Sequence, residues 1–138
     1  MSAAFDILPD LPASPTLALI DRIDEGLPLR AVDRLADQVA PNDKAFKYNF
    51  VSRPTYARRK AQSHARLSPA ESDRVVRFAR VWDLAVSVWK GEDAARAFLL
   101  RPHPLLEGRT PLAVTLSGEQ GGRMVEEVLG RLLYGTGV

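Results

Sequence analysis

Apolar residues recur every three or four positions in several stretches of the chain, which is the spacing of one face of an α-helix. The clearest stretch follows Ser68-Pro69-Ala70-Glu71, where a serine cap, a proline at the first helical position and a glutamate three residues after the serine mark a helix start. Its apolar positions are Val75, Phe78, Val81, Trp82, Ala85, Val86 and Trp89, before Gly91. We expect this helix to be buried at the centre of the fold; its tryptophans could instead line a ligand pocket, although core packing is the commoner role.

Shorter helices are expected before this central one. The segment from Thr16 to Glu25 contains regularly spaced leucines and isoleucines and stops at Gly26, which suits a helix with a glycine just beyond its end. A second helix begins near Pro28, and Pro41 ends it. Residues 1–15 contain three prolines among small and acidic residues, so we expect an irregular arm there.

Two further helices are expected after the central one. The first covers Glu92 to Leu100, and the proline-rich segment from Arg101 to Pro111 follows as a loop. A second capping box, Ser117-Gly118-Glu119-Gln120, then precedes a final helix that Gly135 ends. Its expected apolar face consists of Met124, Val125, Val128, Leu129, Leu132 and Leu133. No stretch has the pattern of a strand, so the predicted fold class is all-α.

Two short segments in the first half resemble a helix-turn-helix. Asn42 can cap a helix from Lys44 to Phe50, and a basic helix from Arg53 to Lys60 follows the break at Val51-Ser52. We therefore expect a helix-turn-helix-like bundle over residues 16–66, joined to a small helical C-terminal domain over residues 67–138.

The charge distribution supports this interpretation. Residues 1–43 contain three basic and eight acidic side chains, whereas residues 44–70 contain seven basic and no acidic ones. Such a basic block is typical of a contact with a phosphate backbone, although a solvated face or a dock for an acidic protein would look the same. The candidate DNA-binding residues are Lys44, Lys47, Arg53, Thr55, Tyr56, Arg58, Arg59 and Lys60, of which Thr55 and Tyr56 are expected to approach base edges.

Catalytic and metal-binding chemistry is not expected. The chain has no cysteine, and its two histidines, His64 and His103, have no motif partners that would form a metal site or a catalytic dyad. We predict a non-enzymatic protein with no metal and no cofactor. The lack of cysteine and of a signal-peptide or membrane-spanning pattern leads us to expect a cytoplasmic protein.

Several landmarks together resemble one family. The segments Arg53-Pro-Thr-Tyr-Ala-Arg-Arg-Lys60 and Leu67-Ser-Pro-Ala-Glu-Ser-Asp-Arg74 are similar to the signature RTLxRR…LSPxESDR of Xre/MbcA/ParS-like antitoxins. The resemblance continues through Ala94 to Leu99, Leu106 to Pro111 and Gly121 to Gly135, and it covers roughly residues 26–137. Phe98-Leu99 stands where the family usually has Trp-Leu, and the spacing from Pro111 to Gly121 is slightly long.

The resemblance implies the antitoxin of a type II toxin-antitoxin system. The implied partner is a RES-domain toxin, an NAD-consuming enzyme related in fold to ADP-ribosyltransferases, which the C-terminal domain holds inactive. We expect the final helix and its glycine-containing tail to block the toxin's cleft, although the tail could simply fray. The toxin-binding candidates are Arg123, Glu127, Arg131, Tyr134, Gly135, Thr136, Gly137 and Val138.

Two further expectations concern assembly and the competing class of protein. A repressor that reads a two-fold operator gains affinity as a dimer, so we expect a homodimer or a hetero-oligomer with the toxin, and repression of the chain's own operon. The alternative is an autonomous helix-turn-helix transcription factor, which would bind DNA tightly without a stable protein partner.

Overall fold

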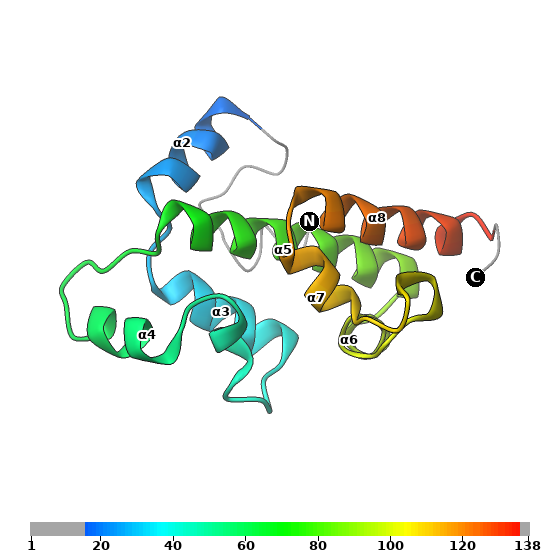
Figure 1. The fold of residues 1–138 in the computed structure, drawn as a ribbon, viewed down its shortest axis with the longest axis horizontal. Coiled ribbons are helices and arrows are strands. Elements are labelled where there is room, and N and C mark those ends of the chain that lie inside the picture. Colours follow the sequence, from blue (N-terminus) through cyan, green and yellow to red (C-terminus); the bar gives the residue numbers. More distant parts are fainter. Residues whose placement is uncertain (1–15, 136–138) are drawn as a thin grey trace. The chain divides into compact units, whose positions relative to one another are not determined.

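The computed structural model describes residues 16–135, and over this range the chain is all-α (Figure 1). The expected arm at residues 1–15 lies outside the described residues. The one β-type contact between described residues is an isolated antiparallel bridge between Pro28 and Arg66. The elements are α2 (Leu17–Glu25), α3 (Arg30–Val39), η1 (Phe46–Asn49), α4 (Arg53–Lys60), α5 (Pro69–Trp89), α6 (Glu92–Leu100), η2 (Pro104–Leu106), α7 (Pro111–Leu116) and α8 (Glu119–Leu133).

The chain forms two compact units, Met1–Val76 and Arg77–Val138. The division falls inside α5, whereas we placed the domain boundary before it, between residues 66 and 67. The expected start of α5 is confirmed, because the helix begins at Pro69 and carries the capping box that the sequence indicates. This first turn belongs to the N-terminal unit.

In the N-terminal unit, the connection between α2 and α3 is hydrogen-bonded to the first turn of α5 and to the residue Leu67 before that helix. The backbone N–H of Leu27 donates to the Ser72 hydroxyl (2.9 Å), and the Leu67 N–H donates to the Leu27 carbonyl (2.8 Å). Gly26 has a φ of 89°, and a Cβ there would lie 2.2 Å from the Leu67 carbonyl oxygen. Glycine therefore ends α2, as expected, and also allows this close crossing. The buried side chains of this unit include Leu27, Val32, Leu35, Val39, Phe46, Phe50 and Val75.

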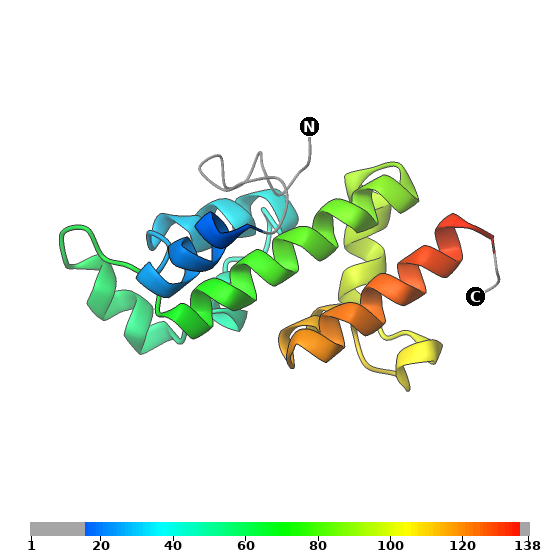
Figure 2. The same ribbon diagram turned by 90° about the horizontal axis from the view of Figure 1, so that it is seen from above.

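In the C-terminal unit, the remainder of α5 provides the centre of the core. Figures 1 and 2 show α8 running alongside this part of α5. The expected buried face is confirmed at its middle, where Trp82 is fully buried, but not at its end. Trp89 is the last residue of α5 and is 40% exposed, with its ring 5.9 Å from that of Phe98. The other large buried side chains of this unit are Phe78, Val81, Leu99, Val125 and Leu129.

The segment expected to be a loop, Arg101 to Pro111, contains the 3₁₀ turn η2, and α7, which the sequence pattern did not indicate, begins at its last residue. Thr110 caps α7, with its hydroxyl accepting from the Ala113 N–H (3.1 Å), and Pro111 occupies the first turn. The cap and the proline are part of the signature that predicted α5, but α7 lacks the glutamate of a capping box and has six residues, too few for a periodic apolar face to be recognised. The expected second capping box is wrong, because the Ser117 hydroxyl donates to the Val114 carbonyl (2.6 Å) and α8 starts after Gly118 without a side-chain cap.

The junction of α7 and α8 yields a stability prediction. A Cβ at Gly121 would lie 1.8 Å from the Val114 carbonyl oxygen, whereas a Cβ at Gly130, in the same helix, meets nothing within 4 Å. Gly121→Ala should lower the free energy of unfolding by about 1–3 kcal/mol through overpacking. Gly130→Ala should raise it by up to about 1 kcal/mol, since alanine favours the helix. Urea denaturation measures both, and equal effects of the two substitutions would contradict the tight α7–α8 packing.

Candidate DNA-binding and toxin-binding surfaces

The turn before α4 is anchored by aromatic packing. Phe46 in η1 and Phe50 after it are both buried, with ring centroids 5.6 Å apart. An α-helix was expected from Lys44 to Phe50, but the segment forms only a 3₁₀ turn. The amide of Asn49 donates to the Phe46 carbonyl (2.8 Å), the acceptor that the Phe50 N–H would use in an α-helix, and that N–H bonds the Lys47 carbonyl instead.

The expected cap of this segment also differs from the structure. Asn42 is exposed, and it is the Asp43 carboxylate that accepts from the Ala45 N–H (2.9 Å). A short element followed by a tight turn and then by α4 nevertheless forms the helix-turn-helix outline that the sequence predicted.

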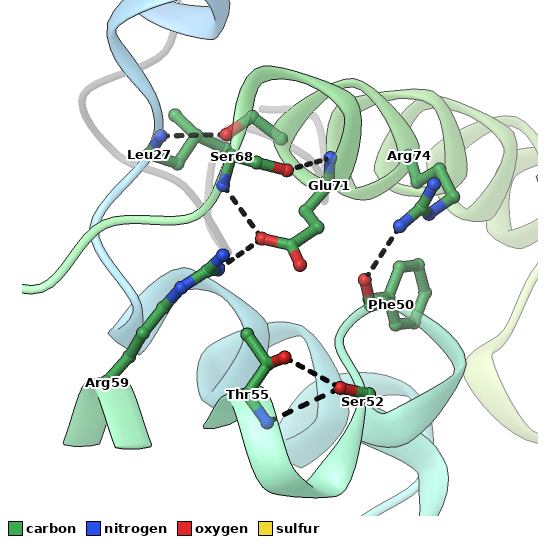
Figure 3. A network of polar contacts seen from close by, with 9 residues as sticks. Leu27, Phe50, Ser52, Thr55, Arg59, Ser68, Glu71 and Arg74 are labelled. Carbon is green, nitrogen blue, oxygen red and sulfur yellow. Dashed lines mark hydrogen bonds and ion pairs between the residues drawn. The ribbon is translucent and has the colours of Figure 1, made fainter. Parts of the chain in front are cut away.

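Helix α4 begins at a local cap. The Ser52 hydroxyl accepts from the Thr55 N–H (3.4 Å) and donates to the Thr55 hydroxyl oxygen at 2.8 Å (Figure 3). Pro54 lies in the first turn, where the absence of a backbone N–H costs nothing. Thr55, which we expected to approach a base edge, is half-buried, and its hydroxyl is engaged by this cap.

Tyr56 lies on the inner side of α4 and is turned away from solvent. It is 5% exposed, and its hydroxyl donates to the Asp33 carboxylate of α3 at 2.8 and 3.0 Å. Burial, and next the hydrogen bond to Asp33, raise the pKa of Tyr56. Tyr56 thus joins α4 to α3, and this geometry gives no support to the expectation that it approaches a base edge.

Lys47 belongs to the same inner cluster. Its ammonium lies 3.4 Å from Asp33 and 4.2 Å from the centre of the Tyr56 ring. Burial lowers the pKa of Lys47, but the contacts with Tyr56 and Asp33 outweigh it and the net pKa is raised. The charge of Lys47 is thus partly neutralised within the protein.

Arg59 points from α4 to the start of α5. Its guanidinium pairs with the Glu71 carboxylate, which also accepts from the Ser68 N–H (2.7 Å), while the Glu71 N–H donates to the Ser68 hydroxyl at 3.1 Å (Figure 3). Arg74, one turn further along α5, donates to the Phe50 carbonyl (3.2 Å). The predicted capping box is confirmed, and it also positions α4 through Arg59. Arg59, a candidate DNA-binding residue, is thus turned toward α5 and paired within the protein.

The Glu71 network should make stability depend on pH. Burial alone would raise the pKa of Glu71, but the bonds from Ser68 and Arg59 outweigh it and lower the pKa. A carboxylate whose folded pKa is lowered stabilises the fold above its unfolded pKa of about 4.5, and this contribution is lost as pH falls through the folded value. Glu71→Gln should lower the free energy of unfolding by about 1 kcal/mol at neutral pH. It should also make the free energy of unfolding fall less steeply as the pH is lowered. Denaturation between pH 3 and 7 measures this, with the exposed Glu25→Gln as control; an unchanged pH dependence would contradict the network.

The basic block thus separates into inner and outer side chains. Lys47 and Arg59 bond to acidic residues, and Arg66 donates to the Gly26 carbonyl (2.8 Å). Arg66 is exposed despite this bond, and the exposed members for which no hydrogen bond to residues 16–135 is described are Lys44, Arg53, Arg58 and Lys60. The Arg53 guanidinium stacks 4.2 Å from the centre of the Tyr48 ring. This contact restricts the rotamers of Arg53, and the side chain stays exposed to solvent. These four residues are the candidate DNA-facing cations.

Two exposed residues of α4 were not predicted. Pro54 and Ala57 lie beside Arg53 and Arg58 at helical spacings of three and four, so the four residues share one exposed face. They carry no charge, and only their spacing from the arginines could have indicated them. Small residues on this face allow α4 to approach a groove closely.

The candidate toxin-binding residues lie along the outer side of α8. Arg123, Glu127 and Arg131 are exposed, and Tyr134, the residue after the helix, is 79% exposed. Gly135 follows in the left-handed conformation (φ 66°) and ends the helix as expected. Thr136, Gly137 and Val138 lie outside the described residues.

Two apolar residues expected to face the core are instead exposed on α8. Met124 is 52% and Leu133 is 49% exposed. The buried residues of α8 are Gly122, Val125, Val128 and Leu129, so the buried stripe is narrower than predicted and includes a glycine. Met124 and Leu133 are nine residues apart and so lie on opposite sides of α8, and only Met124 lies next to the exposed charged residues.

A buried arginine, which the sequence pattern did not indicate, holds the start of α8. Arg77 donates to the Thr115 carbonyl at the end of α7 (2.8 Å) and lies 3.9 Å from the Glu119 carboxylate. A Cβ at Gly122 would lie 3.0 Å from its side chain. The contacts span 38 or more residues, so no local pattern could have indicated them.

His103 has a local structural role. The His103 ring accepts from the Leu105 N–H (3.1 Å) and caps η2. Between residues 16 and 135 no three potential metal-binding side chains of His, Cys, Asp or Glu gather. None of the helices in that range is long and apolar enough to span a bilayer.

A helix-turn-helix outline with an exposed basic helix, followed by a separate helical unit with an exposed mixed face, is the architecture found in regulatory proteins that bind DNA and a protein partner. Residues 18–80 match the antitoxin Xre-like helix-turn-helix domain, and residues 84–135 match the antitoxin Xre/MbcA/ParS C-terminal toxin-binding domain. The chain belongs to the Xre/MbcA/ParS family of antitoxins, as its sequence landmarks indicated.

Two similar proteins are both described as antitoxin Xre. The chain is 30% identical over 128 residues to the antitoxin Xre of Yersinia enterocolitica, covering 91% of this chain and 85% of that protein. It is 30% identical over 115 residues to the antitoxin Xre of Photorhabdus laumondii subsp. laumondii, covering 82% of this chain and 76% of that protein.

Proposed function

We propose that the chain neutralises a RES-domain, NAD-consuming toxin and represses its own operon. In this proposal it acts in the cytoplasm, without catalysis of its own, as the antitoxin of a type II pair. The observation that carries the proposal is the match of residues 84–135 to the toxin-binding domain of the family.

The outer face of α8 is the proposed contact with the toxin. Arg123, Glu127 and Arg131 offer alternating charges, and Met124 and Tyr134 offer apolar surface beside them. Mixed faces of this kind suit partners that must be recognised specifically, because the apolar groups supply burial and the charges fix the register.

Inhibition is proposed to come from the end of the chain. Tyr134 is highly exposed, and Gly135 turns the backbone out of the helix. Residues 134–138 then form a short segment with two glycines, which could enter a narrow NAD cleft with little steric resistance.

Repression is proposed to use the exposed face of α4. Arg53 and Arg58 would contact phosphates or guanine edges, and Lys44 and Lys60 would add phosphate contacts at the sides. The inner contacts of Tyr56 and Arg59 support this role by holding α4 in a fixed orientation.

Co-purification with the protein encoded by the neighbouring reading frame tests this proposal. We expect a stable complex in which that protein no longer consumes NAD, although it does so when isolated. A chain that binds DNA tightly but captures no partner would support the autonomous transcription factor instead. Turnover of NAD by the complex at the rate of the isolated partner would refute neutralisation.

A further inference from the structure

The outer face of α8 contains a stripe with the spacing of a helix-pairing seam. Met124, Glu127, Arg131 and Tyr134 follow one another at intervals of three, four and three residues. This is the a/d spacing at which two helices pack along their length. All four residues are exposed, and Met124 and Tyr134 are 52% and 79% exposed. The stripe is separate from the buried stripe that attaches α8 to its own unit.

The seam carries an apolar residue at each end and two opposite charges between them. When a second copy of the seam runs in the opposite direction, apolar residues therefore meet apolar residues and each charge meets its opposite. In an antiparallel pair with a two-fold axis at position 129, Met124 of one copy lies opposite Tyr134 of the other, and Glu127 lies opposite Arg131. Each pairing occurs twice by symmetry. A parallel pair would place Glu127 opposite Glu127 and Arg131 opposite Arg131, which is unfavourable. The sequence of the seam therefore selects one direction.

We propose that α8 pairs antiparallel with α8 of a second copy of this chain through Met124, Glu127, Arg131 and Tyr134. The two outer layers bury apolar side chains, and the two inner layers join opposite charges. Arg131 also interacts within its own chain. A guanidinium has five N–H donors, so Arg131 can keep that contact and also donate to a carboxylate of the second copy.

The pair is expected to be weak, because the seam spans three helical turns and contains two charged layers. Such a contact is smaller than a stable interface. We therefore expect the pair to have a dissociation constant on the order of 10–1000 μM. Weak pairing has a consequence that rests on the proposed function. The same face is proposed to meet the toxin, so toxin binding would displace the second copy, and free antitoxin would keep this face covered at high concentration.

Charge reversal tests the pair with the purified full chain alone. Glu127→Arg leaves two arginines on the seam and Arg131→Glu leaves two glutamates, so each variant repels its own copy. We expect each to lose self-association by about tenfold or more in sedimentation equilibrium. A one-to-one mixture should regain it, because each arginine then lies opposite a glutamate. This recovery between chains separates the pairing from the intrahelical contact of residues four apart.

Matched controls are Arg101→Glu and Glu107→Arg, which reverse exposed charges in the same unit outside α8. Circular dichroism verifies that every variant is folded, and the controls should associate like the unchanged chain. Single variants that self-associate like the unchanged chain, or a mixture no better than its components, would overturn the proposal. Charge reversals that change only capture of the toxin would also overturn it and assign the face to the toxin alone. Because no toxin enters the mixing experiment, its failure is distinct from failure of the proposed function.

Discussion

Replacing Arg53 and Arg58 together with alanine is expected to lower the affinity for DNA upstream of the chain's own gene by about a hundredfold or more, because each arginine contact to a base is worth about 1–3 kcal/mol. If the two arginines contact phosphates instead, the slope of log affinity against log salt should fall by about 1.8. Fluorescence anisotropy with a labelled duplex, at several salt concentrations, measures both quantities.

The structure also supplies the control for this experiment. Arg101 and Arg109 are exposed in the C-terminal unit, and their double alanine variant loses the same charge away from α4. Its DNA affinity should change far less than that of the Arg53 and Arg58 variant. Arg59→Ala is a poor choice for testing DNA contact, because loss of the Glu71 pair should also destabilise the fold. Equal DNA binding by the two double variants would assign the basic face of α4 to another partner.

Deleting residues 134–138 is expected to restore most of the toxin's activity while leaving a complex that still forms. The proposed division of labour is the reason, since the α8 face supplies association and the tail supplies inhibition. Isothermal titration measures binding, and NAD consumption by the partner measures inhibition. A truncated chain that inhibits fully would place the block elsewhere in the protein.

A complementary variant separates the two roles. Arg123→Ala with Arg131→Ala keeps the tail but removes two charges from the face, so it should weaken association and leave inhibition complete at saturating antitoxin. If it instead binds normally and fails to inhibit, the roles of the face and the tail are reversed.

The elements that could be predicted from the sequence are those whose signals are local. Ser68 and Glu71 are three residues apart, and both hydrogen bonds of their capping box are present. Gly26 and Gly135 mark the ends of α2 and α8 by the left-handed or open backbone that glycine allows. Short elements such as α7 escaped prediction because six residues contain less than two turns of periodicity.

The candidate site was predictable as a segment and not residue by residue. A run of basic residues indicates a charged surface, but it does not show which side chain meets an acidic partner elsewhere. Tyr56 bonds to Asp33, 23 residues away, and Arg59 bonds to Glu71 across a turn. Both partners come from outside the block, so the inner and outer members of α4 could be separated only in the folded chain.

Growth of bacteria that express the protein encoded by the neighbouring reading frame, with and without this chain, tests the central claim most directly. An antitoxin predicts arrested growth when the neighbour is expressed alone and restored growth when both are expressed, with the two proteins recovered as one complex. A neighbour that arrests growth equally in the presence of the folded chain would contradict the account.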